Sequence, residues 1–283
     1  MDPPRRPRAR PGGDARGPAA AAARLADPVA RGQPDRGALR DRVGEALGDR
    51  LVGLYLHGSL ALGDFYPPAS DVDFHAPTAG PLDDRVLERL GAMHAAFKAE
   101  GGWLNRLEGV YLPLTALRRQ DPAGGRLPTV GIDWDFHLGP SGPTWVLDRW
   151  VTREHGVVVA GPDPRELIDP IGPDELRAAV RASMLGHWAE RVAEGADLAW
   201  LRPRGYQAFA ILTMCRDLYV LEHGVLVSKP AAAAWAARRL GPPWPVMAER
   251  AQAWRADERP DDRHLPETLA LVATAIGLAR ATR

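Results

Sequence analysis

Two aspartates separated by one residue follow a Gly-Ser turn in the segment 57–74, HGSLALGDFYPPASDVDF. If residues 71–76 form a strand, Asp71 and Asp73 point to the same side while the residues between and after them point into the core. Two carboxylates on one side repel each other unless a cation lies between them. Carboxylate oxygens are ligands that Mg²⁺ accepts together with waters and substrate phosphates. The spacing therefore predicts a magnesium site at Asp71 and Asp73.

The Gly-Ser turn itself is suited to binding an anion. Gly58 lets a ligand approach the backbone closely, and a helix that starts at Ser59 would direct its N–H groups at phosphate oxygens. The 11 residues between Ser59 and Asp71 allow one helical turn and a loop that returns the chain to the same cleft. The turn therefore predicts phosphate contacts beside the metal.

A third acid, Glu108, lies on another predicted strand, residues 106–114, where it shares a face with Val110 and Leu112. It would complete the acidic set or stand near an incoming hydroxyl as a general base. The reaction implied is phosphoryl or nucleotidyl transfer, which depends on positioning and on stabilisation of charge. A Gly-Ser pair or an Asp-x-Asp alone is unspecific, but their combination with a third acidic strand favours a catalytic site over a structural coincidence.

Composition limits the remaining possibilities. The 283 residues are 45% hydrophobic and 25% charged, which is typical of a soluble globular protein with one large or two modest domains. The formal net charge is zero, so no basic surface for nucleic acid or a membrane is expected. Cys215 is the single cysteine, which excludes an internal disulfide and favours a cytoplasmic location. No membrane anchor and no partner subunit is needed, so we expect a monomer.

Periodicity and turn residues predict the elements that must position these side chains. The N-terminal half reads as mixed α/β, and strand signals stop near residue 162, after which helices dominate. We expect a disordered extension over 1–35, an α/β domain with a mixed sheet and flanking helices over 36–162, which would carry the nucleotidyl-transfer residues, and an all-helical bundle domain over 163–283. The expected strands are 51–59, 71–76, 106–114 and 157–161, and 120–143 reads as a loop. The expected helices are 37–50, 82–100, 144–156, 173–194, 206–223, 229–239, 245–257 and 265–281.

The strand, Gly-Ser and paired-aspartate pattern resembles the polymerase-beta-like nucleotidyltransferase superfamily. Two later blocks narrow the resemblance. LTMCRDLYVLEHGVLVSKPAAAAWAARRL at 212–240 and TREHGVVVAGPDPRELIDP at 152–170 resemble the aminoglycoside O-nucleotidyltransferases of the streptomycin and spectinomycin adenylyltransferase group. The resemblance covers the chain from about residue 40 to its end. It implies ATP-dependent adenylylation of an aminoglycoside-like acceptor, with Mg²⁺ as cofactor.

The resemblance also implies roles for single residues. Asp71 and Asp73 would hold Mg²⁺, and Glu108 occupies the position of the catalytic base. Lys229 matches a lysine that reaches the nucleotide phosphates from the helical domain. Only this residue and one other among the 36 Lys and Arg residues are lysines, and a compact charge on a flexible stem suits a phosphate that moves. The remaining expected nucleotide contacts are Gly58, Ser59, Ser70 and Trp254.

Expected acceptor contacts come from GIDWDF, where Trp134 matches a tryptophan that helps to bind streptomycin in the family. Asp133 and Asp135 beside it could meet ammonium or guanidinium groups, and Glu108 would also face the acceptor. A loop anchored by one buried indole is the structural alternative. For Trp254, a helix-core position is the alternative, because tryptophan at helical spacing is common in cores.

The chain departs from the family pattern in two places. Where drug-modifying relatives carry acids, WLRPRGYQAF places Arg202 and Arg204, which would repel a polycation. A further family aspartate near the nucleotide aligns with Thr144, and Asp148 lies one turn later. Nucleotide transfer is therefore better supported than the identity of the acceptor. Another small polyol, a protein or a tRNA end remain alternative acceptors, and a non-catalytic nucleotide-binding regulator remains a further alternative.

Overall fold

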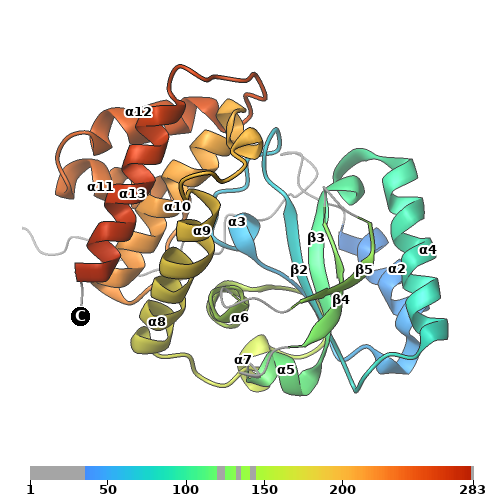
Figure 1. The fold of residues 1–283 in the computed structure, drawn as a ribbon. Coiled ribbons are helices and arrows are strands. Elements are labelled where there is room, and N and C mark those ends of the chain that lie inside the picture. The colour runs from blue at the N-terminus through green and yellow to red at the C-terminus, as the bar shows by residue number, and fades with distance from the viewer. Residues whose placement is uncertain (1–35, 120–124, 132–134, 141–144, 282–283) are drawn as a thin grey trace, which may run out of the picture. The chain divides into compact units, whose positions relative to one another are not determined.

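The computed structural model describes residues 36–119, 125–131, 135–140 and 145–281, which belong to one compact unit, Arg36–Arg283 (Figure 1). The expectation of disorder for residues 1–35 lies outside the described residues. Strands gather in the first half of the unit, and the second half is helical. This arrangement confirms the predicted fold class of a mixed sheet with flanking helices followed by an all-helical region. The domain boundary at residue 162 stays a prediction.

The sheet has six strands in the order β5-β4-β3-β2-β1-β6. Only the central β2–β3 pair is parallel among these neighbours, and the other four pairs are antiparallel. The strands are β1 Leu54–Leu56, β2 Val72–Thr78, β3 Leu107–Pro113, β4 Arg126–Val130, β5 His137–Pro140 and β6 Val157–Ala160.

Helices surround the sheet and form the second half of the chain. Those around the sheet are α2 Arg36–Leu47, α3 Gly58–Ala61, α4 Asp84–Glu100, α5 Leu114–Arg118, α6 Trp145–His155 and α7 Pro164–Leu167. The others are α8 Pro173–Ser183, a π-helical turn Met184–Trp188, α9 Ala189–Arg191, α10 Arg204–His223, α11 Lys229–Arg239, α12 Trp244–Trp254 and α13 Leu265–Ala281.

The prediction of a loop over 120–143 is wrong for the described residues, because β4 and β5 form an antiparallel pair there. Pro128, Gly139 and Pro140 lower the intrinsic strand preference of both segments. The pairing of β4 with β3 compensates, since it supplies hydrogen-bond partners that a local reading of the sequence cannot see. As β5 is at the end of the strand order, its Pro and Gly residues are tolerated.

The two faces of the sheet pack on different helices. Val72 and Phe74 of β2 are fully buried in a core that they share with α2 and α4. On the opposite face, Val110 and Leu112 of β3 pack against α5 and α7. Figure 1 shows α4 and α2 on one side of the sheet and α6 on the other. This division decides which polar side chains of β2 and β3 can meet the helical region.

Helix α6 connects the sheet to the helical region. Its Thr152 hydroxyl forms a 2.8 Å hydrogen bond with His75 of β2. Its Val146, Leu147 and Val151 belong to the core of the helical region. At the centre of that core α10 is buried on most of its circumference and contacts α8, α11, α12 and α13. No helix in the described ranges has the length and apolar character needed to span a membrane.

Candidate active site

Asp73 and Glu108 stand opposite each other in the register of the parallel strands β2 and β3. Because residues paired in this way project from the same face, both carboxylates lie on the α6 side of the sheet, whereas Val72 and Phe74 lie on the other. The predicted alternation is therefore confirmed for Val72, Asp73 and Phe74. Asp71 precedes β2 with a side chain that is 30% exposed, and Nη2 of Arg106 lies 3.9 Å from its Oδ1.

The Gly-Ser turn packs directly against the Asp73 carboxylate. Gly58 begins the short helix α3 with φ of 59°, and a Cβ at this position would collide with the Asp73 side chain. The backbone N–H of Ser59 donates a hydrogen bond to that carboxylate, and the N–H of His57 donates to the Asp73 carbonyl at 2.9 Å. Only glycine fits here, because it avoids the collision and tolerates the positive φ.

The loop from the turn to Ser70 is closed by its own hydrogen bonds. The backbone N–H of Asp64 donates to the Ser59 carbonyl at 2.8 Å. At the other end, the buried Ser70 hydroxyl accepts from the Tyr66 N–H at 2.9 Å, and the Ser70 N–H donates to the Tyr66 carbonyl at 2.8 Å. Both predicted phosphate-binding serines therefore belong to one internally bonded loop.

Lys229 brings a positive charge from the helical region to the aspartates. It is the first residue of α11, which Ser228 caps. Burial, and after it the nearby Arg216, lower the pKa of Lys229, whereas Asp73 and Asp71 oppose the shift, and the resulting pKa is about 7. Its Nζ lies 4.3 Å from the centroid of the Phe209 ring. The Lys229 side chain is thus desolvated and lies within electrostatic range of both aspartates.

Further charged groups surround Asp73. Burial raises the pKa of Asp73, and Lys229 and Arg216 counteract part of that shift. Burial likewise raises the pKa of Asp148 on α6, which interacts electrostatically with His57, Asp73 and Arg216. The site therefore holds carboxylates whose ionised forms lack full compensation, and an added cation would stabilise them.

Beside this cluster lies a cavity of about 230 Å³ between α6, α8 and α10. Asp148 and Arg216, which interact electrostatically with Asp73, line this cavity, and Trp188 and Phe209 contribute aromatic surface. Asp217 also lines it, and burial raises the pKa of this carboxyl to about 6. The cavity can therefore accommodate a molecule with both apolar ring faces and polar groups.

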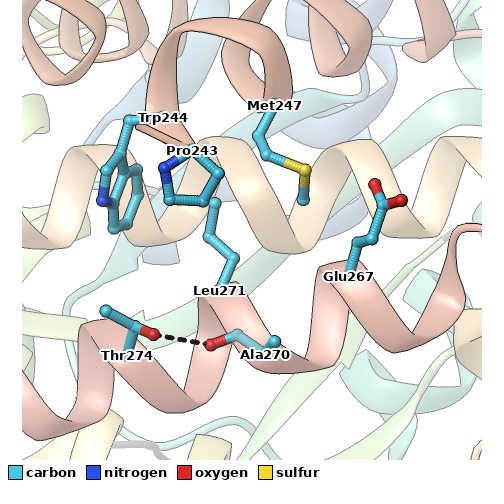
Figure 2. Close-up of a pocket in the computed structure, with 7 residues that line it drawn as sticks. All are labelled: Pro243, Trp244, Met247, Glu267, Ala270, Leu271 and Thr274. Carbon is cyan, nitrogen blue, oxygen red and sulfur yellow. Dashed lines mark hydrogen bonds between the residues drawn. The ribbon is translucent and has the colours of Figure 1, made fainter. Parts of the chain in front are cut away.

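A second cavity, of about 220 Å³, lies between α12 and α13 (Figure 2). Trp244, Met247 and Leu271 make it mainly apolar, and Glu267 is at its edge. None of its lining residues belongs to the cluster around Asp73. We assign it no part in the site.

The acids do not form a complete metal cage on their own. Within the described parts of the chain, no group of three or more His, Cys, Asp or Glu side chains is arranged to hold a metal ion. Two carboxylates beside a turn suited to phosphate nevertheless match Mg²⁺, which normally takes its other ligands from waters and substrate phosphates. The donor set therefore fits a magnesium ion that arrives with a nucleotide.

Comparison with known proteins agrees with this geometry. The family description "Aminoglycoside adenylyltransferase, C-terminal domain" matches residues 166–276. The chain is 30% identical over 231 residues to "Aminoglycoside (3'') (9) adenylyltransferase" of Klebsiella pneumoniae, which covers 74% of this chain and 79% of that protein. The protein of the same name from Shigella flexneri gives the same values. The chain belongs to the aminoglycoside adenylyltransferase family. It is accordingly a nucleotidyltransferase.

A solved structure shares the fold. It is described as the crystal structure of spectinomycin adenyltransferase AAD(9) from Enterococcus faecialis with ATP and spectinomycin. The TM-score is 0.66 with 16% sequence identity, and the match covers 85% of this chain and 97% of the other. At this identity the match supports the common fold of the adenylyltransferase family, including both the sheet and the helical region.

The structure brings most of the predicted site residues together. They are Gly58, Ser59, Ser70, Asp71, Asp73, Glu108 and Lys229. Asp135 is not among them, because its exposed carboxylate pairs at 2.9 Å with Lys98 of α4, on the opposite side of the sheet from α6. Trp134 and Asp133, like Thr144, lie outside the described residues. The acceptor roles of Trp134 and Asp135 stay predictions.

Trp254, the last residue of α12, packs within the helical region. The guanidinium carbons of Arg204 and Arg250 lie 4.8 and 5.2 Å from its ring, and the His264 ring centroid lies 5.3 Å away. It also packs against the helical core. These contacts explain its position structurally, and its contact with a nucleotide stays a prediction.

The two arginines expected to repel a polycation carry their own counter-charges. Arg202 forms a bidentate pair with Asp262, at 2.7 and 2.6 Å. Arg204 binds Asp261 at 2.8 Å and Asp257 at 3.2 Å. These ion pairs largely offset the expected repulsion. Sequence alone does not reveal them, because the aspartates follow 53 to 60 residues later in the chain.

Two residues of the cluster had no assigned role in the sequence. Arg216 lies in the LTMCRDLY block, but the abundance of arginine in this chain hides a single functional one. For Asp148 the sequence left open whether it substitutes for the family aspartate that aligns with Thr144. Its position on α6, facing His57 and Asp73, requires knowledge of how α6 packs against β2.

Proposed function

We propose that the chain transfers the adenylyl group of ATP to a hydroxyl of an aminoglycoside or aminocyclitol and releases pyrophosphate. Membership of the adenylyltransferase family supports this function. The observation that carries it is the pairing of Asp73 with Glu108 in register, beside Lys229. A metal-binding carboxylate, a base and a phosphate-binding cation are then contributed by three elements to one place.

In the proposed reaction, Glu108 accepts the proton of the acceptor hydroxyl. The acceptor oxygen forms a bond to the α-phosphorus of ATP, and the bond from that phosphorus to the oxygen bridging to the β-phosphate breaks. The electron pair of the broken bond leaves with pyrophosphate. A general base of this kind contributes about 10²- to 10⁴-fold to the rate.

The triphosphate would contact Gly58, Ser59 and Ser70 on one side and Lys229 on the other. Asp71 and Asp73 would hold Mg²⁺, which when bound supplies positive charge to the phosphate oxygens. The raised pKa of Asp73 supports this assignment. Burial disfavours the ionised carboxylate, and a bound cation would stabilise it. Lys229 stabilises the negative charge that develops on the leaving pyrophosphate.

For the acceptor we propose the cavity between α6, α8 and α10. Trp188 and Phe209 offer surface to the apolar faces of sugar or cyclitol rings, and Asp148 and Asp217 offer carboxylates to amino groups. A cationic amine beside these carboxyls would favour their ionised forms, which burial alone disfavours. The family resemblance also proposes Trp134 and Asp135 as acceptor contacts, but Asp135, paired with Lys98 on the other side of the sheet, does not line this cavity. A monomer in the cytoplasm, where ATP is available, is the proposed setting.

The test is a panel of aminocyclitols and aminoglycosides incubated with ATP and Mg²⁺ and scored by product mass and pyrophosphate release. We expect a monoadenylylated product from at least one compound, and none from the Asp73→Asn variant. Radiolabelled ATP with cell extract examines the alternatives in parallel. Label that enters only protein or RNA would contradict the proposed acceptor class, and an absence of pyrophosphate release with every acceptor would contradict the proposed reaction.

A further inference from the structure

An ion pair ties the end of α12 to the loop between Ser59 and Ser70. Nη1 of Arg255 lies 2.9 Å from Oδ1 of Asp64, and Nη2 lies 3.3 Å from Oδ2. Nη2 also lies 3.4 Å from the backbone carbonyl oxygen of Asp64. The two residues are 191 positions apart, and their side chains are only 17% and 14% exposed. A paired geometry at this depth is worth more than an exposed pair, because solvent screens it less.

Arg255 contacts the loop at a second point. Its guanidinium carbon lies 5.2 Å from the centroid of the Tyr66 ring. The Tyr66 N–H donates to the Ser70 hydroxyl, and the Asp64 N–H donates to the Ser59 carbonyl. Arg255, which directly follows α12, therefore contacts both loop residues that are bonded to the two predicted phosphate-binding serines.

The same arginine lies near Lys229. Arg255 is among the groups that lower the pKa of Lys229, so the guanidinium is within electrostatic range of the ammonium. Both terminal nitrogens of its guanidinium, Nη1 and Nη2, however, already donate hydrogen bonds to the Asp64 carboxylate. The loop and Lys229 would bind the same triphosphate from opposite sides, and their separation must match its length.

We propose that Asp64 and Arg255 are positioning residues, whose ion pair holds the Ser59–Ser70 loop at the distance from Lys229 that a triphosphate requires. The inference rests on the proposed function only in taking ATP as the nucleotide. Neither residue touches the reacting atoms. The pair instead removes motion of the loop relative to α12 before the nucleotide arrives, which lowers the entropic cost of binding.

If Arg255 instead binds the phosphate directly, replacing Asp64 should have the opposite effect on nucleotide binding. If Arg255 served the phosphate itself, neutralising Asp64 would release the guanidinium and leave nucleotide binding unchanged or tighter. If the pair positions the loop, loss of either partner has the same consequence. A double-mutant cycle separates the two, because residues that act as one unit give non-additive effects.

The experiment measures the dissociation constant of α,β-methylene-ATP with Mg²⁺ by calorimetry, with no acceptor present. The variants are Asp64→Asn, Arg255→Ala, Arg255→Lys and the double variant Asp64→Asn/Arg255→Ala. The matched control is Glu267→Gln, which removes the 2.7 Å ion pair of Arg250 on the same helix. Melting temperatures are recorded for every variant, and Arg255→Lys provides a folded comparison if the alanine variant does not fold.

We expect Asp64→Asn and Arg255→Ala each to weaken binding about 10-fold, with the double variant no weaker than either alone. The dissociation constant of Arg255→Lys should lie between those of the two single variants and that of the wild type, and Glu267→Gln should bind like the wild type. Unchanged or tighter binding by Asp64→Asn, additive losses in the double variant, or a loss equal to that of the control would each overturn the proposal. Because the probe needs no acceptor, failure of the acceptor panel would leave this test intact.

Discussion

Asp73 and Glu108 are direct partners in the parallel register of β2 and β3. Neighbouring strands lie about 4.8 Å apart, so the two side chains project side by side from one face of the sheet. The sheet thus provides the geometry of the proposed transfer with two side chains from rigid elements. The helical region supplies Lys229 to the same place.

Replacing Asp73 by asparagine should abolish activity without destabilising the fold. We expect kcat/KM to fall by at least about 100-fold, because the charge that holds the metal is lost. The raised pKa of Asp73 means that the folded state disfavours the ionised carboxyl, so a neutral amide removes a cost at neutral pH. The melting temperature should therefore stay equal or rise.

Activity assays and thermal melts at pH 7.5 check this prediction, with the exposed Asp49→Asn as the control. Retained activity would contradict the metal role of Asp73. A large decrease in melting temperature would show instead that the carboxylate stabilises the fold, contrary to its burial.

Helix positions were the most predictable part of the fold. The predicted spans 229–239 and 265–281 coincide with α11 and α13. For α11 the reason is local, since Ser228 caps the helix and Pro230 follows at its start. The β4–β5 pair was missed because its stability comes from pairing with β3 rather than from the propensity of its own residues.

The residues of the candidate site also fall into two groups, those that local sequence predicts and those that depend on packing. Asp71 and Asp73 could be found because strand alternation places them together within one segment. Glu108 could be placed on the right face, but its register opposite Asp73 is a tertiary property. Arg216, Asp148 and the Asp64–Arg255 pair depend on how α6, α10 and α12 pack, and no local pattern encodes that packing.

Nucleotide binding should depend on pH through Lys229. Because burial lowers its pKa to about 7, the free protein loses the ammonium as pH rises through that value. A triphosphate favours the charged form, so binding at pH 7 to 8 should be accompanied by proton uptake. Calorimetry of α,β-methylene-ATP in buffers of different ionisation enthalpy measures this uptake.

The Lys229→Met variant should bind weakly and show less proton uptake than the wild type. The stability of the fold should change with pH in the opposite direction to nucleotide binding. The unfolded chain keeps the lysine proton to about pH 10.4, so the stability of the free wild type should rise as pH increases above about 7. Equal proton uptake in both proteins would contradict a role for Lys229 in this dependence.

The stability of the fold at acid pH should depend partly on His94, a buried residue of α4 outside the candidate active site. Burial lowers its pKa to about 4, and its Nε2 lies 2.8 Å from the Tyr111 hydroxyl. The unfolded chain binds the proton near pH 6.5, so stability should fall as pH decreases from about 6.5 to 4. The His94→Gln variant should show a flatter melting temperature over this range, and an unchanged slope would assign the sensitivity to other groups.

The most direct test of the proposed reaction is the Glu108→Gln variant, assayed for adenylyl transfer and for binding of α,β-methylene-ATP in the same preparation. We expect kcat/KM to fall about 10²- to 10⁴-fold while the dissociation constant of the analogue stays near that of the wild type, because a general base is needed for transfer and not for binding. Glu100→Gln, an exposed residue on α4, serves as the control. Transfer at the wild-type rate by Glu108→Gln would contradict the role of Glu108 as the base opposite Asp73.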